Sequence, residues 1–168
     1  MKLITLLLVI TTSLYGQSKI EIAKELQKQY NPPNKNYVVF IDYSKPISEK
    51  RLYVIDMKTS ETILTTKVAH GINSGKEYAT EFSNTDKSLK SSLGVYVTQE
   101  TYYGHFGYSL RVNGLNKTNS NARHRKIIFH SNKKMKTKWS WGCFSTDEKI
   151  NKKLIDIIKN GCLVYVYK

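Results

Sequence analysis

Long apolar runs, paired histidines and acidic residues are all scarce in this 168-residue sequence. The apolar run at residues 3–10 is too short to span a bilayer, which argues against a stable transmembrane helix. The four histidines lack the i, i+4 spacing of zinc motifs, so we expect neither a metal site nor a cofactor. No internal repeat, low-complexity tract, helix-turn-helix, zinc-finger or RNA-binding fingerprint is found, so the sequence gives no sign of a nucleic-acid-binding module.

The shortage of acids leaves the chain strongly basic. Lys and Arg number 27 against 13 Asp and Glu, which gives a formal net charge of +14. Such a balance favours anionic partners. If the chain is exported, envelope polymers such as peptidoglycan stems with free carboxylates are better candidates than nucleic acid. The alternative is that many of these lysines only form a solvated face.

The N-terminus has the charged, apolar and polar zones of a secretory signal. We therefore expect a signal peptide over residues 1–16, cleaved after Gly16, and a periplasmic or cell-envelope location. No cysteine lies near that boundary, so no lipoprotein anchor is expected. The alternative is an amphipathic or buried first element. Residues 17–36 then form a weakly amphipathic helix over Lys19–Tyr30 and a linker.

Residues 37–168 read as one β-rich α+β domain, a sandwich or partial barrel with a few short helices. Tyr37–Asp42 is a continuous apolar run of the kind buried on both faces of a sheet. Thr146 is expected to cap a late helix that ends near Gly161. The absence of a long strand-helix alternation argues against a doubly wound sheet. The remaining expected strands are residues 51–56, 62–68, 94–101, 109–114, 126–129 and 163–167, with an aromatic turn at 102–107.

The two cysteines have unlike surroundings. Cys143 follows Gly142 in a turn-like segment, 13 positions after His130, which ends an apolar run. A cysteine is a nucleophile only as the thiolate, and an imidazole can take its proton and return one to a leaving amine. An activated thiol would ionise at unusually low pH, whereas the alternative is an inert thiol in a turn. Cys162 is read as a buried strand residue, although a disulfide between the two remains open.

Ser140-Trp141-Gly142-Cys143, preceded by a strand ending in His130, resembles the signature of the murein L,D-transpeptidase (YkuD-like) catalytic domain. The order of further motifs resembles a divergent branch of that family, and the resemblance covers roughly residues 37–167. These motifs are His70-Gly71 with Asn73-Ser74-Gly75, Phe82-Ser83-Asn84, Ser91-Ser92-Leu93-Gly94-Val95-Tyr96, Gly107-Tyr108-Ser109-Leu110-Arg111 and Gly114-Leu115.

This resemblance implies a peptidoglycan enzyme in which Cys143 is the nucleophile and His130 the base. The thiolate would attack the carbonyl of the third stem residue, expel terminal D-Ala, and pass the acyl group to an amine or to water. Ser140 and Gly142 match the motif, whereas Trp141 replaces its histidine and Ser145 replaces its frequent asparagine. The His130–Ser140 interval is also shorter than usual. A catalytically silent wall-binding domain is the alternative, and a sortase-like site lacks an arginine after Arg125.

Several further residues are candidates for support or substrate binding. Amides around Gly142 and Cys143 are candidates for an oxyanion hole, with Ser140 and Trp141 as motif support. His70 and Gly71 would either line the cleft or order a loop. Arg111 and Arg125 would hold a stem carboxylate, and the alternative for each is a structural salt bridge.

Overall fold

The computed structural model describes residues 18–135 and 137–168, so the expected signal peptide lies outside the described residues. These residues form an eight-stranded sheet with the strand order β3-β2-β1-β8-β4-β5-β6-β7. The strands are β1 (Tyr37–Asp42), β2 (Leu52–Asp56), β3 (Thr62–Thr66), β4 (Gly94–Gly104), β5 (Gly107–Gly114), β6 (Ile128–Ser131), β7 (Phe144–Thr146) and β8 (Leu163–Tyr167). The helices are α1 (Lys19–Tyr30) and α2 (Glu148–Ile158), with 3-10 turns η1 (Ile72–Ser74) and η2 (Asn132–Lys134).

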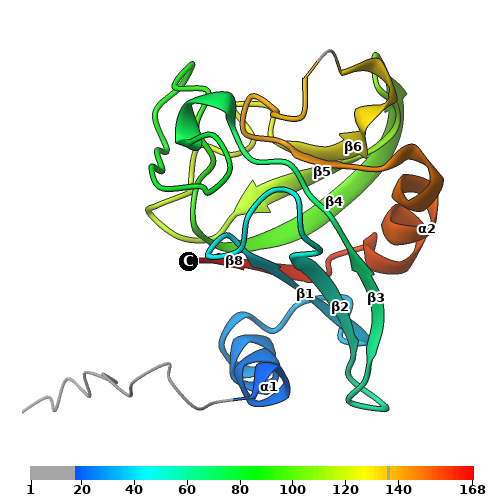
Figure 1. The fold of residues 1–168 in the computed structure, drawn as a ribbon. Helices are drawn as coiled ribbons and strands as arrows, with labels where there is room; N and C mark the ends of the chain where they lie inside the picture. The colour runs from blue at the N-terminus through cyan, green and yellow to red at the C-terminus, as the bar shows by residue number, and fades with distance from the viewer. Residues whose placement is uncertain (1–17, 136) are drawn as a thin grey trace, which may run out of the picture.

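The sheet is strongly curled (Figure 1). Two strand pairs, β1 with β8 and β6 with β7, are parallel, and the remaining pairs are antiparallel. The chain that continues from β3 runs beside β7, where the Ala69 amide donates to the Ser145 carbonyl at 2.9 Å. Gly71 and Ser140 form a further parallel bridge. This nearly closed sheet confirms the predicted β-rich architecture with a few short helices.

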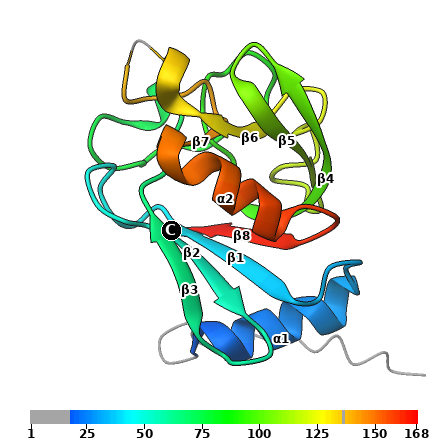
Figure 2. The same ribbon diagram turned by 90° about the vertical axis from the view of Figure 1, so that its right-hand side faces the viewer.

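Two hydrophobic clusters explain the unbroken apolar run of β1. Val39 faces the inner cluster, which contains Leu154 of α2, and α2 lies across the concave side of the sheet (Figure 2). Val38 and Phe40 face the second cluster, which contains Leu26 of α1. Because successive side chains of a strand point to opposite faces, a strand covered by a helix on each face is apolar throughout.

Local signals set the bounds of α1 where the sequence predicts them. Ser18 and Glu21 form a reciprocal capping box, and Asn31 ends the helix in the left-handed conformation with φ 41°. The prediction for α2 is wrong at its start. Asp147 is the N-cap and its side chain accepts from the Lys149 amide, whereas Thr146 completes β7.

The strand that carries His130 also differs from the prediction. Lys126 adopts φ 58° and closes a turn, in which the Ile127 amide donates to the Ala122 carbonyl. Strand β6 therefore begins at Ile128, and His130 lies within it rather than at its end. The aromatic turn is likewise shorter than predicted, because β4 and β5 extend into it. Within residues 18–135 and 137–168, no helix has the length and apolar character needed to cross a membrane.

Candidate active site

Cys143 lies in the bend just before β7, next to the beginning of β6. Its thiol donates to the Lys126 carbonyl at an Sγ to O distance of 3.5 Å. In the parallel pair of β6 and β7, Phe144 lies opposite Phe129 and Ser145 lies opposite His130. Continuing that register places Cys143 beside Ile128, two positions before His130 along β6.

Ser140 fixes the turn that carries the thiol. Its hydroxyl donates to the Cys143 carbonyl at 2.8 Å and accepts from the Gly142 amide at 3.1 Å. Its backbone amide donates to the His70 carbonyl at 2.9 Å, and its carbonyl accepts from the Ile72 amide at 2.8 Å. The segment after β3 therefore holds this turn in place through backbone hydrogen bonds.

Two glycines permit the close approach of these segments. Gly142 adopts φ 111°, and a Cβ there would lie 2.8 Å from the Lys90 carbonyl oxygen. A Cβ at Gly71 would lie 2.3 Å from the Leu89 carbonyl oxygen. Gly71 is thus a backbone contact point beside the turn.

The thiol of Cys143 is difficult to ionise. Burial raises its pKa to about 11, and a backbone hydrogen bond from Ile128 and the charge of Arg125 oppose this increase only in part. This direction is opposite to the low pKa expected of an activated thiol. The thiol is therefore protonated at neutral pH, and its nucleophilic use requires a base.

His130 is held in the form that a base requires. Its side chain is almost fully buried, and its ring stacks on Phe106 with centroids 4.2 Å apart. Nδ1 lies 2.9 Å from the Ser131 carbonyl oxygen, which only accepts, so Nδ1 carries the hydrogen and Nε2 the lone pair. Burial also lowers the pKa of His130, which is neutral at pH 7. Within the described residues, Nε2 has no hydrogen-bonding partner.

Cys143 and His130 are neighbours. No hydrogen bond joins the side chains of these two described residues. Cys143 and Ser145 are two positions apart, so strand alternation places Cys143 on the side of the sheet that His130 faces. Diagonal neighbours on one face of adjacent strands are about 7–8 Å apart, a separation that an aromatic side chain spans in part.

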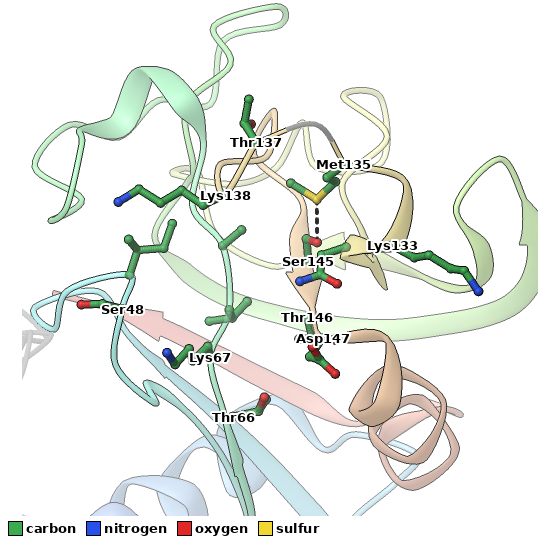
Figure 3. A pocket seen from close by; sticks show the side chains of 14 residues that line it. Ser48, Thr66, Lys67, Lys133, Met135, Thr137, Lys138, Ser145, Thr146 and Asp147 are labelled. Carbon is green, nitrogen blue, oxygen red and sulfur yellow. Dashed lines mark hydrogen bonds between the residues drawn. The ribbon is translucent and has the colours of Figure 1, made fainter.

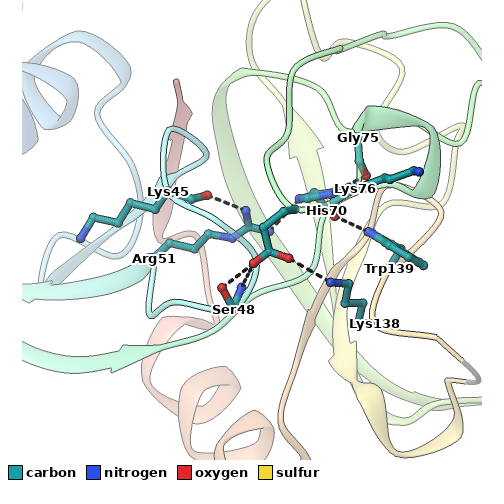
Figure 4. A network of polar contacts seen from close by, with 9 residues as sticks. Lys45, Ser48, Arg51, His70, Gly75, Lys76, Lys138 and Trp139 are labelled. Carbon is teal, nitrogen blue, oxygen red and sulfur yellow. Dashed lines mark hydrogen bonds and ion pairs between the residues drawn. The ribbon is translucent and has the colours of Figure 1, made fainter.

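The structure places His70 in the interior rather than on a cleft. Its side chain is fully buried; Nδ1 accepts from Arg51 at 3.0 Å, and Nε2 donates to the Gly75 carbonyl at 3.0 Å (Figure 4). Burial is the main cause that lowers its pKa. Both ring nitrogens are thus occupied, and His70 orders the segment that holds Ser140.

The two arginine candidates have different environments. Arg111 pairs with Glu100 at 3.1 Å and lies over the Tyr102 ring at 4.1 Å, as in the structural alternative. Arg125 is half-buried beside Gly142 and donates to the Lys90 carbonyl at 2.6 Å. Its other acceptors are the Ser83 carbonyl and the hydroxyls of Ser88 and Ser92.

Trp141, a candidate for motif support, lies exposed in the turn that carries the thiol. Its residue surface is 74% exposed, although Ser140 and Gly142 on either side are buried.

Arg51 is a structural residue that the sequence reasoning missed. It is fully buried and donates twice to the Val68 carbonyl, at 3.0 and 2.7 Å. Its only sequence signal is a basic residue at the start of an apolar strand.

A cavity of about 810 Å³ lies beside β7, and Ser145 and Thr146 of that strand line it (Figure 3). Sequence reasoning missed it because its walls come from separate segments of the chain. No group of three or more His, Cys, Asp and Glu side chains suited to a metal ion occurs in the part of the chain that the structure describes. The residues lining the cavity are Ile47, Ser48, Thr66, Lys67, Val68, Ala69, Asn132, Lys133, Met135, Thr137, Lys138, Ser145, Thr146 and Asp147.

Comparison with protein families matches residues 12–167 to the L,D-transpeptidase catalytic domain, YkuD_2. The match covers nearly the whole chain, so the protein belongs to this family. The match includes helix α1 as well as the sheet. No match is found among curated protein sequences.

Solved structures share the fold at low sequence identity. The helical cell shape determining protein Pgp2 of Campylobacter jejuni, as its K307A mutant, has a TM-score of 0.56 and 11% identity, over 89% of this chain and 55% of that one. The L,D-transpeptidase LdtMt1 in complex with imipenem has a TM-score of 0.50 and 12% identity, over 79% and 59%. The chain spans about half to three-fifths of the length of such structures.

Proposed function

We propose that the protein is an exported, cysteine-dependent L,D-transpeptidase that acts on peptidoglycan stem peptides in the cell envelope. Family membership supports a peptidoglycan-related activity. The observation that carries the proposal is the position of His130, whose neutral imidazole keeps Nε2 available on the strand next to the thiol. A neutral imidazole can accept the proton of a protonated thiol.

In the proposed reaction, His130 Nε2 accepts the proton of the Cys143 thiol as the sulfur attacks the carbonyl of the third stem residue. Amides around Gly142 and Cys143 stabilise the oxyanion. The imidazolium then gives its proton to the amine of the departing D-Ala, which leaves a thioester on Cys143. An amine of a second stem attacks the thioester, its proton passes through His130 to the released thiolate, and the crosslinked product departs.

Two alternative functions involve the same site. Water in place of the acceptor amine would make the protein an L,D-carboxypeptidase with the same residues. A silent wall-binding domain is favoured by the raised pKa of Cys143 and by the missing hydrogen bond to His130.

The test is mass spectrometry of disaccharide-tetrapeptide and whole sacculi incubated with the mature protein. Crosslinked dimers that disappear in Cys143→Ala and His130→Gln, but persist in Cys162→Ala, establish the transpeptidase. Tripeptides alone establish the carboxypeptidase. Absence of both products, with the protein still pelleting with sacculi, establishes the binding domain, and product formation by Cys143→Ala refutes the proposed nucleophile.

A further inference from the structure

The side chain of Arg125 is fastened to one segment of the chain through both of its terminal nitrogens. Nη1 donates to the Ser83 carbonyl at 2.9 Å and to the Ser92 hydroxyl at 2.7 Å. Nη2 donates to the Lys90 carbonyl at 2.6 Å and to the Ser88 hydroxyl at 3.2 Å. Each terminal nitrogen thus uses both of its hydrogens within the protein, which leaves no free pair of donors for a substrate carboxylate.

The segment that Arg125 holds, residues 83–92, contains neither helix nor strand. Two of its residues, Lys87 and Leu89, adopt left-handed conformations with φ of 57° and 56°. Such conformations persist only where the surrounding contacts determine them. The segment also reaches the chain that braces the thiol turn, because the Ser91 hydroxyl accepts from the Gly71 amide at 3.0 Å. Arg125 therefore orders a segment that contacts this brace.

The guanidinium of Arg125 also lies against the turn that carries Cys143. Nη2 is 3.2 Å from the point where a Cβ on Gly142 would lie. The next residue, Lys126, supplies the carbonyl that accepts from the thiol. The charge of Arg125 lowers the pKa of Cys143, in opposition to the larger effect of burial. Consecutive residues thus place a cation beside the turn and an acceptor at its thiol.

The charge of Arg125 has no paired counter-charge. The guanidinium forms no ion pair within residues 18–135 and 137–168. Asp86 acts on it electrostatically, but that carboxylate lies 3.9 Å from His124. Tyr43 also interacts with the charge of the thiol, and burial raises its pKa, so it is neutral near pH 7, as is His130. Because a half-buried charge is screened less than an exposed one, the potential at the thiol turn is positive.

We propose that Arg125 is a positioning residue whose fixed charge stabilises the Cys143 thiolate and whose hydrogen bonds hold residues 83–92 against the thiol turn. In the proposed reaction, negative charge develops on sulfur as His130 takes its proton, and again when the acceptor amine displaces the thiolate. A cation already held in place needs no reorganisation at either step. This inference rests on the proposed function, because it gives Arg125 a role in the reaction at Cys143.

The test compares two alkylating reagents on the folded full chain. Iodoacetamide is neutral and iodoacetate is an anion, and the Cys143 thiolate displaces iodide from both. The ratio of the two rates reports the potential at the sulfur, because the thiolate fraction cancels and altered access affects both reagents. The rates are measured at about pH 9 and low ionic strength, where screening is weakest, by mass spectrometry of the peptide that contains Cys143.

Three variants assign the effect to the charge. Arg125→Gln should lower the ratio of the iodoacetate rate to the iodoacetamide rate about three- to tenfold, the range of a charge that shifts a pKa by up to about one unit. Arg125→Lys keeps the charge and should stay within about twofold of the wild-type ratio. Arg123→Gln is the matched control and should leave the ratio unchanged, since Arg123 is exposed on the same turn and pairs with Glu100 at 2.7 Å.

An unchanged ratio in Arg125→Gln overturns the proposal. An equal decrease in Arg125→Lys also overturns it, because the effect would then not depend on the charge. If Arg125→Gln does not fold, the wild type decides. Its ratio in the folded state should exceed its ratio in urea about three- to tenfold, and equal ratios overturn the proposal.

Turnover separates this role from substrate binding. Arg125→Gln should lower kcat on disaccharide-tetrapeptide and leave KM unchanged, whereas a raised KM with unchanged kcat would make Arg125 a substrate-binding residue and overturn the proposal. The two proposals fail separately. A ratio that falls in Arg125→Gln, with no product from the unmodified protein, refutes only the transpeptidase. Product formation together with a ratio that does not depend on Arg125 refutes only the role of Arg125.

Discussion

The ionisation of Cys143 allows a quantitative test of the electrostatics around the thiol. At pH 8 a thiol with a pKa of about 11 is about 0.1% thiolate, whereas an ordinary cysteine with a pKa of about 8.5 is about 24% thiolate. Because the thiolate is the reactive form, Cys143 should be alkylated about 200-fold more slowly than a small-molecule thiol at this pH. Its rate should rise with pH up to about 11.

The assay is timed alkylation with iodoacetamide, followed by digestion and mass spectrometry of the separate peptides that contain Cys143 and Cys162. Burial raises the pKa of Cys162 as well, so it should also react slowly in the folded protein. In urea both cysteines should react like a free cysteine, which is the internal control. If folded Cys143 is alkylated at pH 7–8 as fast as a free thiol, the conclusion that burial determines the pKa of Cys143 is refuted.

The same shift has a consequence for stability. The folded protein holds the Cys143 proton more tightly than the unfolded chain does, because its pKa is raised on folding. This contribution is fully present below pH 8.5 and declines as the pH rises from about 8.5 towards 11. Denaturant titrations across that range, with Cys143→Ala as the reference, should show the wild-type free energy of unfolding falling more steeply.

Three substitutions test the packing around the turn. Gly142→Ala should destabilise the protein by about 1–3 kcal/mol in urea titrations and abolish turnover, because φ is 111° and the new Cβ meets the Lys90 carbonyl; unchanged stability would contradict this geometry. Trp141→Ala should change the free energy of unfolding by less than about 0.5 kcal/mol, since the residue is 74% exposed, so any change in KM reports contact with substrate. Arg51→Met should lower the free energy of unfolding by about 2–3 kcal/mol, because the buried Val68 carbonyl loses its donor; an equal loss in the exposed control Lys50→Met would remove this explanation.

Helix α1 and the N-terminal strands were predictable because their signals are local. Each signal, the capping box of Ser18 and Glu21 or the apolar run of β1, is contained in a few neighbouring residues of the sequence. Strand β7 was not predicted, since it has only three residues and its pairing with β6 depends on distant parts of the chain. For the same reason Thr146, which suits either a strand or a helix cap, was given the wrong role.

The sequence predicted that Cys143 and His130 lie together, but it did not predict the residues around them. The sequence indicated Cys143 and His130 as partners, and the register of β6 and β7 makes them neighbours. The environment of the thiol was not predictable, because burial by distant segments determines its pKa. The structural role of Arg51 was not predicted, since most of its partners are backbone carbonyls that carry no sequence signature. For His70 the sequence left a cleft role and a loop-ordering role open, and its contacts match the second.

The place of β8 in the strand order bears on the order in which the sheet assembles during synthesis. This strand, the last along the chain, lies between β1 and β4 and joins two antiparallel groups, β3-β2-β1 and β4-β5-β6-β7. The segment that braces the thiol turn continues from the first group, and the turn itself belongs to the second. Until residues 163–167 have left the ribosome, β8 cannot join the two groups, so we expect the turn that carries Cys143 to be braced only late in synthesis.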